Sequence, residues 1–331
     1  MEVKNQKEFK LYRLADLMEK SPKENPYIIE GMVPEEAITS ITADSGKGKS
    51  LLALIMTYHI AAGEPLFGLF KVKQSRVIIV DLEMDEDIII TRVKSIFNRN
   101  ELPVFYHYGT AWQIDNDNDY EALEKVIIEN GIQVVIFDTL SSIHSKRENE
   151  SSEMREINAL FLRLIQETGV TIIYLHHHRK SQKGENFSQS SSRGSTEIIA
   201  KAASHLLIDS QKWINEDGIS INSLIVQQEK SRRPDGIKAF RVDVRYLAEN
   251  NKTYWEFKGS IEEDKRSEAK KRIMEILQDR MAHTIKDFTI NIKDVCEKYI
   301  RWSLKDLERD HQITSYKHGG NVMFYILNNT T

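Results

Sequence analysis

Cysteine is almost absent from this sequence, which has a single one at Cys296. One thiol excludes a disulfide framework, and without a CxxC pair a zinc-ribbon type of site is excluded as well. Long hydrophobic runs are also missing: stretches such as LLALIM (51–56) fall far short of the about 18 residues that cross a membrane, and the N-terminus lacks an apolar signal-peptide core. These absences predict a cytoplasmic protein with no membrane partner.

A large excess of one charge is lacking too, because 46 Lys and Arg stand against 50 Asp and Glu and the net charge is −4. The overall composition therefore does not by itself indicate nucleic acid as a partner. The 331 residues are enough for one core of about 200 to 250 residues and a small second domain.

The sequence does contain a regular alternation of short β-branched runs with longer amphipathic stretches, which follows an N-terminal arm at 1–35. This alternation is typical of a parallel sheet covered by helices. The expected strands are 37–43, 76–83, 133–139 and 170–176, and the expected helices are 49–63, 85–97, 118–130 and 153–168. Further strands, at 204–210, 219–229, 237–247 and 252–258, extend the sheet or add a hairpin to it. The pattern predicts an α/β fold over 36–258, with a parallel core sheet and flanking helices.

A linker at 259–268 and a second domain at 269–331 are expected after this core. The tail reads as three short helices and a strand pair around Gly319 and Gly320, which is the order of a winged helix-turn-helix. From 265 to 331 it carries 13 Lys and Arg against 9 Asp and Glu, and its third helix places Arg301, Lys305 and Arg309 on one face. This face suits DNA phosphates and bases, while a protein-binding module is the alternative.

The stretch ADSGKGKS (43–50) fits the phosphate-binding pattern GxxxxGK[ST], except that alanine occupies the first position. An apolar strand before it and a helix after it favour a phosphate cradle for ATP over a plain Gly-rich turn. Alanine is acceptable at the first position if the backbone there does not need a positive φ. In such a cradle Lys49 reaches the outer phosphates, Ser50 ligates Mg²⁺, and the remaining contacts come from the loop and the start of the helix: Asp44, Ser45, Gly46, Lys47, Gly48 and Leu51.

Two acidic positions at strand ends complete the expected hydrolytic site. Asp138 ends the apolar run VVIFD and is the expected Mg²⁺ ligand, but Thr139 follows it, so the base that activates water must come from elsewhere. We expect Glu83 to be this base, at the tip of a strand lying beside the P-loop strand. Asp81 is the alternative base, and capping of the next helix is the structural alternative for Glu83.

Three consecutive histidines, at 176–178, end another strand. Their side chains alternate between faces and cannot converge on one metal ion, so His176 or His177 is expected to sense the γ-phosphate from two strands away. The following loop carries Arg179, Lys180, Lys183 and Arg193 and suits single-stranded phosphates, with a plain surface loop as the alternative. A second basic loop with Lys230, Arg232 and Arg233 suits an arginine finger supplied to a neighbouring subunit, or else a solvated loop.

The order of the segments ADSGKGKS, VDLEMD, VVIFDTLSS, YLHHHRKS, SSRGS and EKSRRPDG resembles the RecA-like ATPases of the plasmid RepA and replicative DnaB helicase group, over about residues 25–260. The resemblance implies Glu83 as the catalytic glutamate, Lys230 and Arg232 as the intersubunit finger in preference to Arg233, and Arg92 against the adenine. It also implies a hexameric ring that draws single-stranded DNA through a central channel.

The sequence thus predicts a magnesium-dependent ATPase that forms a ring and acts as a DNA helicase or translocase in replication, of a plasmid, phage or other mobile element. The first alternative is a DNA-bound ATPase switch that regulates or loads without unwinding. The second is a P-loop kinase of a small molecule, which the two basic loops disfavour, because they suit a ring interface and a channel better than a small-substrate lid.

Overall fold

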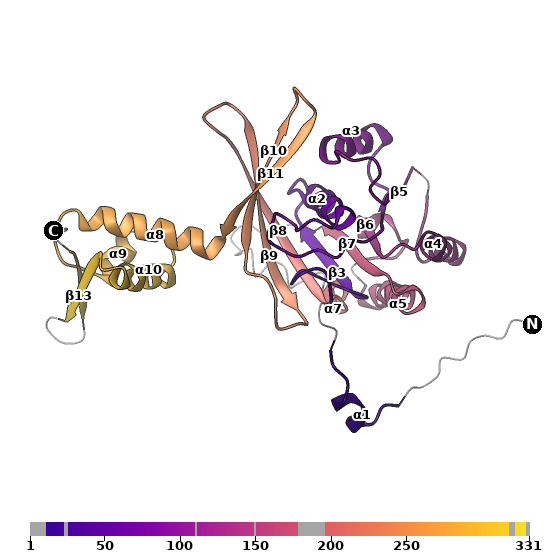
Figure 1. Cartoon of the computed structure of the whole chain (residues 1–331), viewed down its shortest axis with the longest axis horizontal. Coiled ribbons are helices and arrows are strands. Elements are labelled where there is room, and N and C mark those ends of the chain that lie inside the picture. The colour runs from indigo at the N-terminus through magenta and orange to yellow at the C-terminus, as the bar shows by residue number, and fades with distance from the viewer. Residues whose placement is uncertain are drawn as a thin grey trace, which may run out of the picture.

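The computed structural model describes residues 11–22, 26–109, 111–148, 150–177, 196–317 and 322–328 (Figure 1). The described helices are α1 (Leu14–Met18), α2 (Lys49–Ala62), α3 (Glu86–Ile96), α4 (Asp117–Asn130), η1 (Leu140–Ser142), α5 (Ser151–Thr168), α7 (Thr196–Ala200), α8 (Ile261–Leu277), α9 (Ile285–Asn291) and α10 (Glu297–Arg309). The strands are β1 (Tyr27–Ile29), β2 (Val33–Pro34), β3 (Ile38–Ala43), β4 (Val77–Asp81), β5 (Val104–Tyr108), β6 (Val134–Asp138), β7 (Thr171–His177), β8 (Ser204–Ile214), β9 (Ser220–Ser231), β10 (Phe240–Leu247), β11 (Lys252–Ser260), β12 (His283–Thr284), β13 (Ile313–Lys317) and β14 (Met323–Leu327).

A nine-stranded sheet forms the centre of the molecule, in the order β11-β10-β9-β8-β3-β7-β6-β4-β5. The strands from β5 to β8 in this order are parallel, and β9, β10 and β11 continue the sheet antiparallel. The predicted α/β fold with a parallel core sheet is therefore confirmed, and the later strands extend that sheet as expected. The edge strand β5 was missed, because its partly exposed residues VFYHY lack a continuous apolar run.

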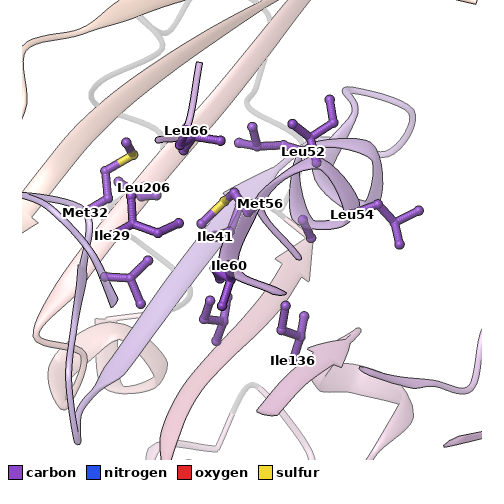
Figure 2. Close-up of a cluster of buried hydrophobic side chains, with 14 of the residues drawn as sticks. Ile29, Met32, Ile41, Leu52, Leu54, Met56, Ile60, Leu66, Ile136 and Leu206 are labelled. Atoms are coloured by element: carbon purple, nitrogen blue, oxygen red, sulfur yellow. The ribbon is translucent and has the colours of Figure 1, made fainter. Parts of the chain in front are cut away.

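Helices cover both faces of the parallel strands, because alternate residues of each buried strand point to opposite sides. On one face α2 packs Leu52, Met56 and Ile60 against Ile41 of β3 and Ile136 of β6, as Figure 2 shows. On the other face α4 and α5 pack against the alternate residues of the same strands. The site therefore stands on a two-sided core, at the carboxyl edge of the sheet.

The strand order differs from the expectation at two places. β4, which precedes Glu83, lies three strands from β3, whereas β7, which ends at His177, pairs directly with β3. The histidine strand, expected two strands away, is thus the neighbour of the P-loop strand, and the expectation that the Glu83 strand lies beside the P-loop strand was wrong. Strand order depends on long-range pairing, and the local pattern of each strand does not specify it.

The N-terminal boundary also differs, because β1 and β2 belong to the core. Ile28, Ile29, Met32 and Val33 are at most 2% exposed and lie in the same apolar cluster as α2. The expected arm at 1–35 therefore overlaps the core from about Tyr27 onward. Before this point α1 buries none of its residues.

The tail from α8 to β14 forms a helix, a short strand, two helices and two strands, with a three-stranded sheet in the order β12-β14-β13. The winged helix-turn-helix itself stays a prediction. The expected linker at 259–268 has regular structure, because β11 runs to Ser260 and α8 begins at Ile261, and the division into two domains stays a prediction. An ion pair between Arg241 and Asp264 (3.2 Å) joins this helix to β10. No helix among the described residues is long and apolar enough to cross a membrane.

Candidate active site

The P-loop joins the end of β3 to the start of α2. Ala43 is the last residue of β3, so its extended backbone suits alanine, while Gly46 and Gly48 have φ values of 76° and 90°. A Cβ on Gly48 would lie 2.7 Å from Leu224 Cδ2 of β9. Lys47 donates to the Ser210 carbonyl (2.9 Å) and pairs with Asp209 (2.7 Å), both on β8. The antiparallel extension of the sheet therefore supports the loop from one side.

Lys49, the first residue of α2, points back into this loop and is 5% exposed. Its Nζ donates to the carbonyls of Ala43 (2.9 Å) and Asp44 (3.2 Å) and lies 3.1 Å from His177 Nδ1. Burial, followed by the nearby Lys49 charge, lowers the pKa of His177, so its imidazole is neutral at pH 7. Nδ1 then accepts from Lys49 and Nε2 carries the proton, because Lys49 has only donors to offer.

Asp138 ends β6 beside the start of α2 and is 5% exposed. Burial raises its pKa to about 7, against a hydrogen bond from Ser50 that lowers it. Its Oδ1 is buried and has no hydrogen-bond partner in the part of the chain that the structure describes. A buried carboxylate oxygen of this kind, next to a serine hydroxyl, fits the few protein ligands that Mg²⁺ takes beside nucleotide phosphates. Asp138 and Ser50 would hold the ion.

Glu83 lies just beyond β4, with a side chain that is 38% exposed. Its Oε1 accepts a hydrogen bond of 2.5 Å from Thr139 Oγ1 and lies 3.9 Å from His177 Nε2. Asp81, the alternative base, is 4% exposed and accepts from the backbone N–H groups of Glu83 and Met84, both at 3.1 Å. Both hydrogen bonds go to Oδ1 of this buried carboxylate, and Glu83 is the more accessible acid.

Arg92 of α3 lines a small cavity together with Ser50, Asp81 and Asp138, and its guanidinium donates to Met84 Sδ at 2.9 Å. The structure therefore brings Arg92 to the carboxylate end of the site. The adenine contact stays a prediction that this placement does not support.

Lys230 and Arg232, at the end of β9, both bind the carbonyl end of α7. Lys230 Nζ donates to Ile199 O and Ala200 O, each at 3.0 Å, and Arg232 donates to Ala200 O at 3.0 Å. Cations stabilise the carboxyl ends of helices in this way. Arg233 instead lies over the Tyr27 ring at 5.4 Å, which leaves Arg232 as the exposed member of the pair. Whether Arg232 reaches a neighbouring subunit stays a prediction.

The remaining expected contacts lie away from the P-loop. Arg179, Lys180, Lys183 and Arg193 fall outside the described residues. Arg301, Lys305 and Arg309 are exposed on α10, and Arg301 pairs with Glu297 (2.5 Å). Ser45 and Gly46 are exposed on the loop, and Leu51 is half-buried at the start of α2. Within the described ranges, no group of three or more His, Cys, Asp and Glu could hold a metal ion.

With this geometry in view, the comparison with known proteins decides the family. Residues 5–183, more than half of the chain, match the model of the family AAA_25, described as AAA domain. The protein belongs to this AAA domain family. Together with the α/β architecture, this membership makes the chain a RecA-like P-loop ATPase. The chain is also similar to a KaiC-like protein, PH0186, from the hyperthermophilic archaea Pyrococcus horikoshii OT3, with 19% identity, a TM-score of 0.45, and coverage of 66% of this chain and 94% of that chain.

Two side chains of this AAA domain site were not expected from the sequence. Thr139 donates a hydrogen bond to Glu83, and Asp209 forms an ion pair with Lys47. The only available signal for Thr139 was a hydroxyl directly after the acidic strand end, at a place where many ATPases need an acid. Asp209 gave no signal, because an isolated acid in a strand is indistinguishable from a surface residue.

Proposed function

We propose that this AAA domain protein is a magnesium-dependent ATPase that forms a ring and acts as a DNA helicase or translocase in replication, of a plasmid, phage or other mobile element. One observation supports it above the others: His177, the last described residue before the basic segment 178–195, contacts both Lys49 and Glu83. A change at the phosphates can thus reach that segment through one imidazole. This coupling is what a motor needs and a simple hydrolase does not.

Each residue has a role in the proposed hydrolysis. Lys49 leaves the carbonyls of Ala43 and Asp44 to bind the outer phosphates, because a phosphate anion attracts the ammonium group more strongly than a neutral carbonyl does. Glu83 orients and deprotonates the attacking water. His177 offers its Nε2 proton toward the γ-phosphate side of the site. When bound, Mg²⁺ would be held by Ser50 and Asp138 and would neutralise phosphate charge.

The proposal of a ring depends on the two cations Lys230 and Arg232. These cations lie at the end of β9 and donate hydrogen bonds to α7 carbonyls of their own chain. We assign Arg232 to the nucleotide of a neighbouring subunit, where such a cation raises turnover by orders of magnitude. A hexamer with cytoplasmic localisation and a central DNA channel completes this proposal.

The test is ATP turnover with and without single-stranded DNA, followed by strand separation of a forked duplex. We expect single-stranded DNA to raise turnover of the wild type, and Glu83→Gln to lower turnover about a hundredfold or more in both conditions while leaving a measurable residual rate. Turnover that is insensitive to single-stranded DNA would argue against translocation.

A DNA-bound ATPase switch is the second candidate, and the tail favours it. Arg301, Lys305 and Arg309 lie along one exposed face of α10, as a recognition helix of a winged helix would present them. A switch predicts that duplex DNA raises turnover more than single strands do, and that the forked duplex stays annealed. If neither form of DNA binds, we expect the tail to bind a protein partner instead.

A further inference from the structure

Thr139 occupies a fixed position between the Mg²⁺ ligand and the candidate base. It follows β6 directly, is 1% exposed, and its Oγ1 donates to Glu83 Oε1 at 2.5 Å. The Ser141 hydroxyl lies 2.9 Å from the same Oγ1. A threonine hydroxyl has one proton, so with that proton on Glu83 the serine must be the donor to Thr139. The result is a hydrogen-bond chain from Ser141 through Thr139 to Glu83.

The backbone of Thr139 is held as firmly as its hydroxyl. Its N–H donates to Ser142 Oγ (3.1 Å), and the Ser142 hydroxyl donates to the Thr139 carbonyl (2.8 Å). Farther along the segment, Ser145 donates to Asp115 (2.6 Å) and Arg147 pairs with Glu153 (2.7 Å). The hydroxyl that donates to Glu83 therefore belongs to a segment that hydrogen bonds and an ion pair hold in place.

Glu83 needs such a partner, because it stands beyond the end of its strand with a side chain that is 38% exposed. A free glutamate there would sample several rotamers and lose entropy each time it adopted the reactive one. With Oε1 bound by Thr139, Oε2 has no hydrogen bond to the described residues and can accept one from water. Such orientation is catalytically valuable, because small misplacements of a reacting group cost large factors in rate.

We infer that Thr139 is a positioning residue for hydrolysis: its hydroxyl fixes the carboxylate of Glu83 in the orientation that takes the proton from water. The inference rests on the proposed role of Glu83 and goes beyond it by naming the group that holds the base. It requires neither a ring nor DNA.

The deciding experiment measures basal kcat and KM for Thr139→Val, Thr139→Ser and Thr57→Val. Valine keeps the shape and removes the hydroxyl, so we expect kcat to fall roughly tenfold or more while KM for ATP stays unchanged. Serine restores the donor and should return kcat to within about threefold of wild type. Thr57 is fully buried and its hydroxyl donates to the Ala53 carbonyl of its own helix (2.8 Å), so Thr57→Val controls for loss of a buried hydroxyl and should leave kcat unchanged.

Several outcomes would overturn the inference. Unchanged kcat in Thr139→Val, with Tm close to wild type, would mean that the hydroxyl does not position the base. A rise in kcat would mean that Thr139 restrains Glu83 in an unreactive orientation. Failure of serine to rescue a folded protein that still binds a fluorescent ATP analogue would point to packing by the methyl group instead.

A double-mutant cycle separates this inference from the proposed function. In a Glu83→Gln background, Thr139→Val should cause no further loss, because the group it positions is gone. An additive further loss would refute positioning through Glu83. If Glu83→Gln alone turns over ATP at the wild-type rate, the proposed base is wrong, whatever the effect of Thr139.

Discussion

At the scale of single residues, the site is a set of charged groups whose ordinary solution behaviour is changed by burial. Lys49 is buried, and burial lowers its pKa while Asp138 and Glu83 raise it. Burial instead raises the pKa of Asp138, because a buried carboxyl favours its neutral, protonated form. Ionisation of this buried carboxyl therefore costs stability.

This cost predicts a pH-dependent effect of Asp138→Asn without Mg²⁺ or nucleotide. Asp138 has a pKa of about 7 when folded against an ordinary value of 3.8, so between these values the folded state holds a proton that the unfolded state has lost. Wild-type stability should fall as the pH rises through this window, while asparagine does not titrate there. We expect the stability gained by Asp138→Asn to grow by about 2 kcal/mol between pH 5 and pH 8. Urea unfolding of both proteins at the two pH values measures this difference.

A gain that is the same at pH 5 and pH 8 would contradict the raised pKa. Adding Mg²⁺ with nucleotide at pH 8 should reverse the order of stability, because only the wild type has the full ligand set.

At the scale of elements, the P-loop works because a strand end, a tight loop and a helix start meet within eight residues. The loop needs positive φ at Gly46 and Gly48, and Leu224 of β9 closes the space beside Gly48. The first position needs no such freedom, because Ala43 continues β3. The departure from the usual glycine pattern thus falls where the backbone tolerates it.

Gly48→Ala and Ala43→Gly should therefore have unequal effects. Alanine at 48 is strained at φ 90° and collides with Leu224, so we expect a loss of about 1–3 kcal/mol in stability and of ATP binding. Glycine at 43 should cost only about 0.5–1 kcal/mol and retain ATP binding. Urea unfolding and titration with a fluorescent ATP analogue measure both effects. Equal losses of binding in the two variants would show that the first position also needs its side chain.

At the scale of the whole molecule, the main question is how one copy meets another. The sheet continues from the P-loop strand β3 through β8 to β9 (Figure 1). One sheet therefore connects Lys49, at the start of the helix that follows the P-loop, with Lys230 near the end of β9. α8 then runs on from β11 without an irregular linker, so the tail is joined to the same sheet. In the proposed ring, a change at the subunit interface would be transmitted to both the site and the tail through this sheet.

Mixing two inactive variants tests the finger proposed at Arg232. Arg232→Ala keeps its P-loop and Lys49→Ala keeps its finger, so an equal mixture should recover turnover at about a quarter of the interfaces of a ring. Arg233→Ala is the matched control, because Arg233 lies over Tyr27 and should retain activity alone. Mass photometry with ATP and Mg²⁺ shows that oligomers form, and capture of one variant through an affinity tag on the other shows that they are mixed. No recovery in mixed oligomers would mean that Arg232 does not act in trans.

Much of the fold and of the nucleotide site was predictable from local sequence. The P-loop between a strand and a helix follows from residues 43–50 and their neighbours, and Asp138 follows from the apolar run that it ends. β5 was not predictable in this way, because its edge position leaves its residues partly exposed. The N-terminal strands β1 and β2 were missed for another reason: they are short, and only contact with the core buries them.

The sequence by itself determined the α/β class, the P-loop and the acidic strand ends, since these depend on backbone preferences and periodicity within a few residues. Only the tertiary structure decided that β7 rather than β4 lies beside β3, that Thr139 holds Glu83, and that Lys230 and Arg232 bind the end of α7. Lys230 and Ala200 are 30 positions apart in the sequence, and Thr139 and Glu83 are 56 positions apart. Such pairs form because the summed burial of the whole core selects one strand order, and no local stretch of sequence encodes that sum.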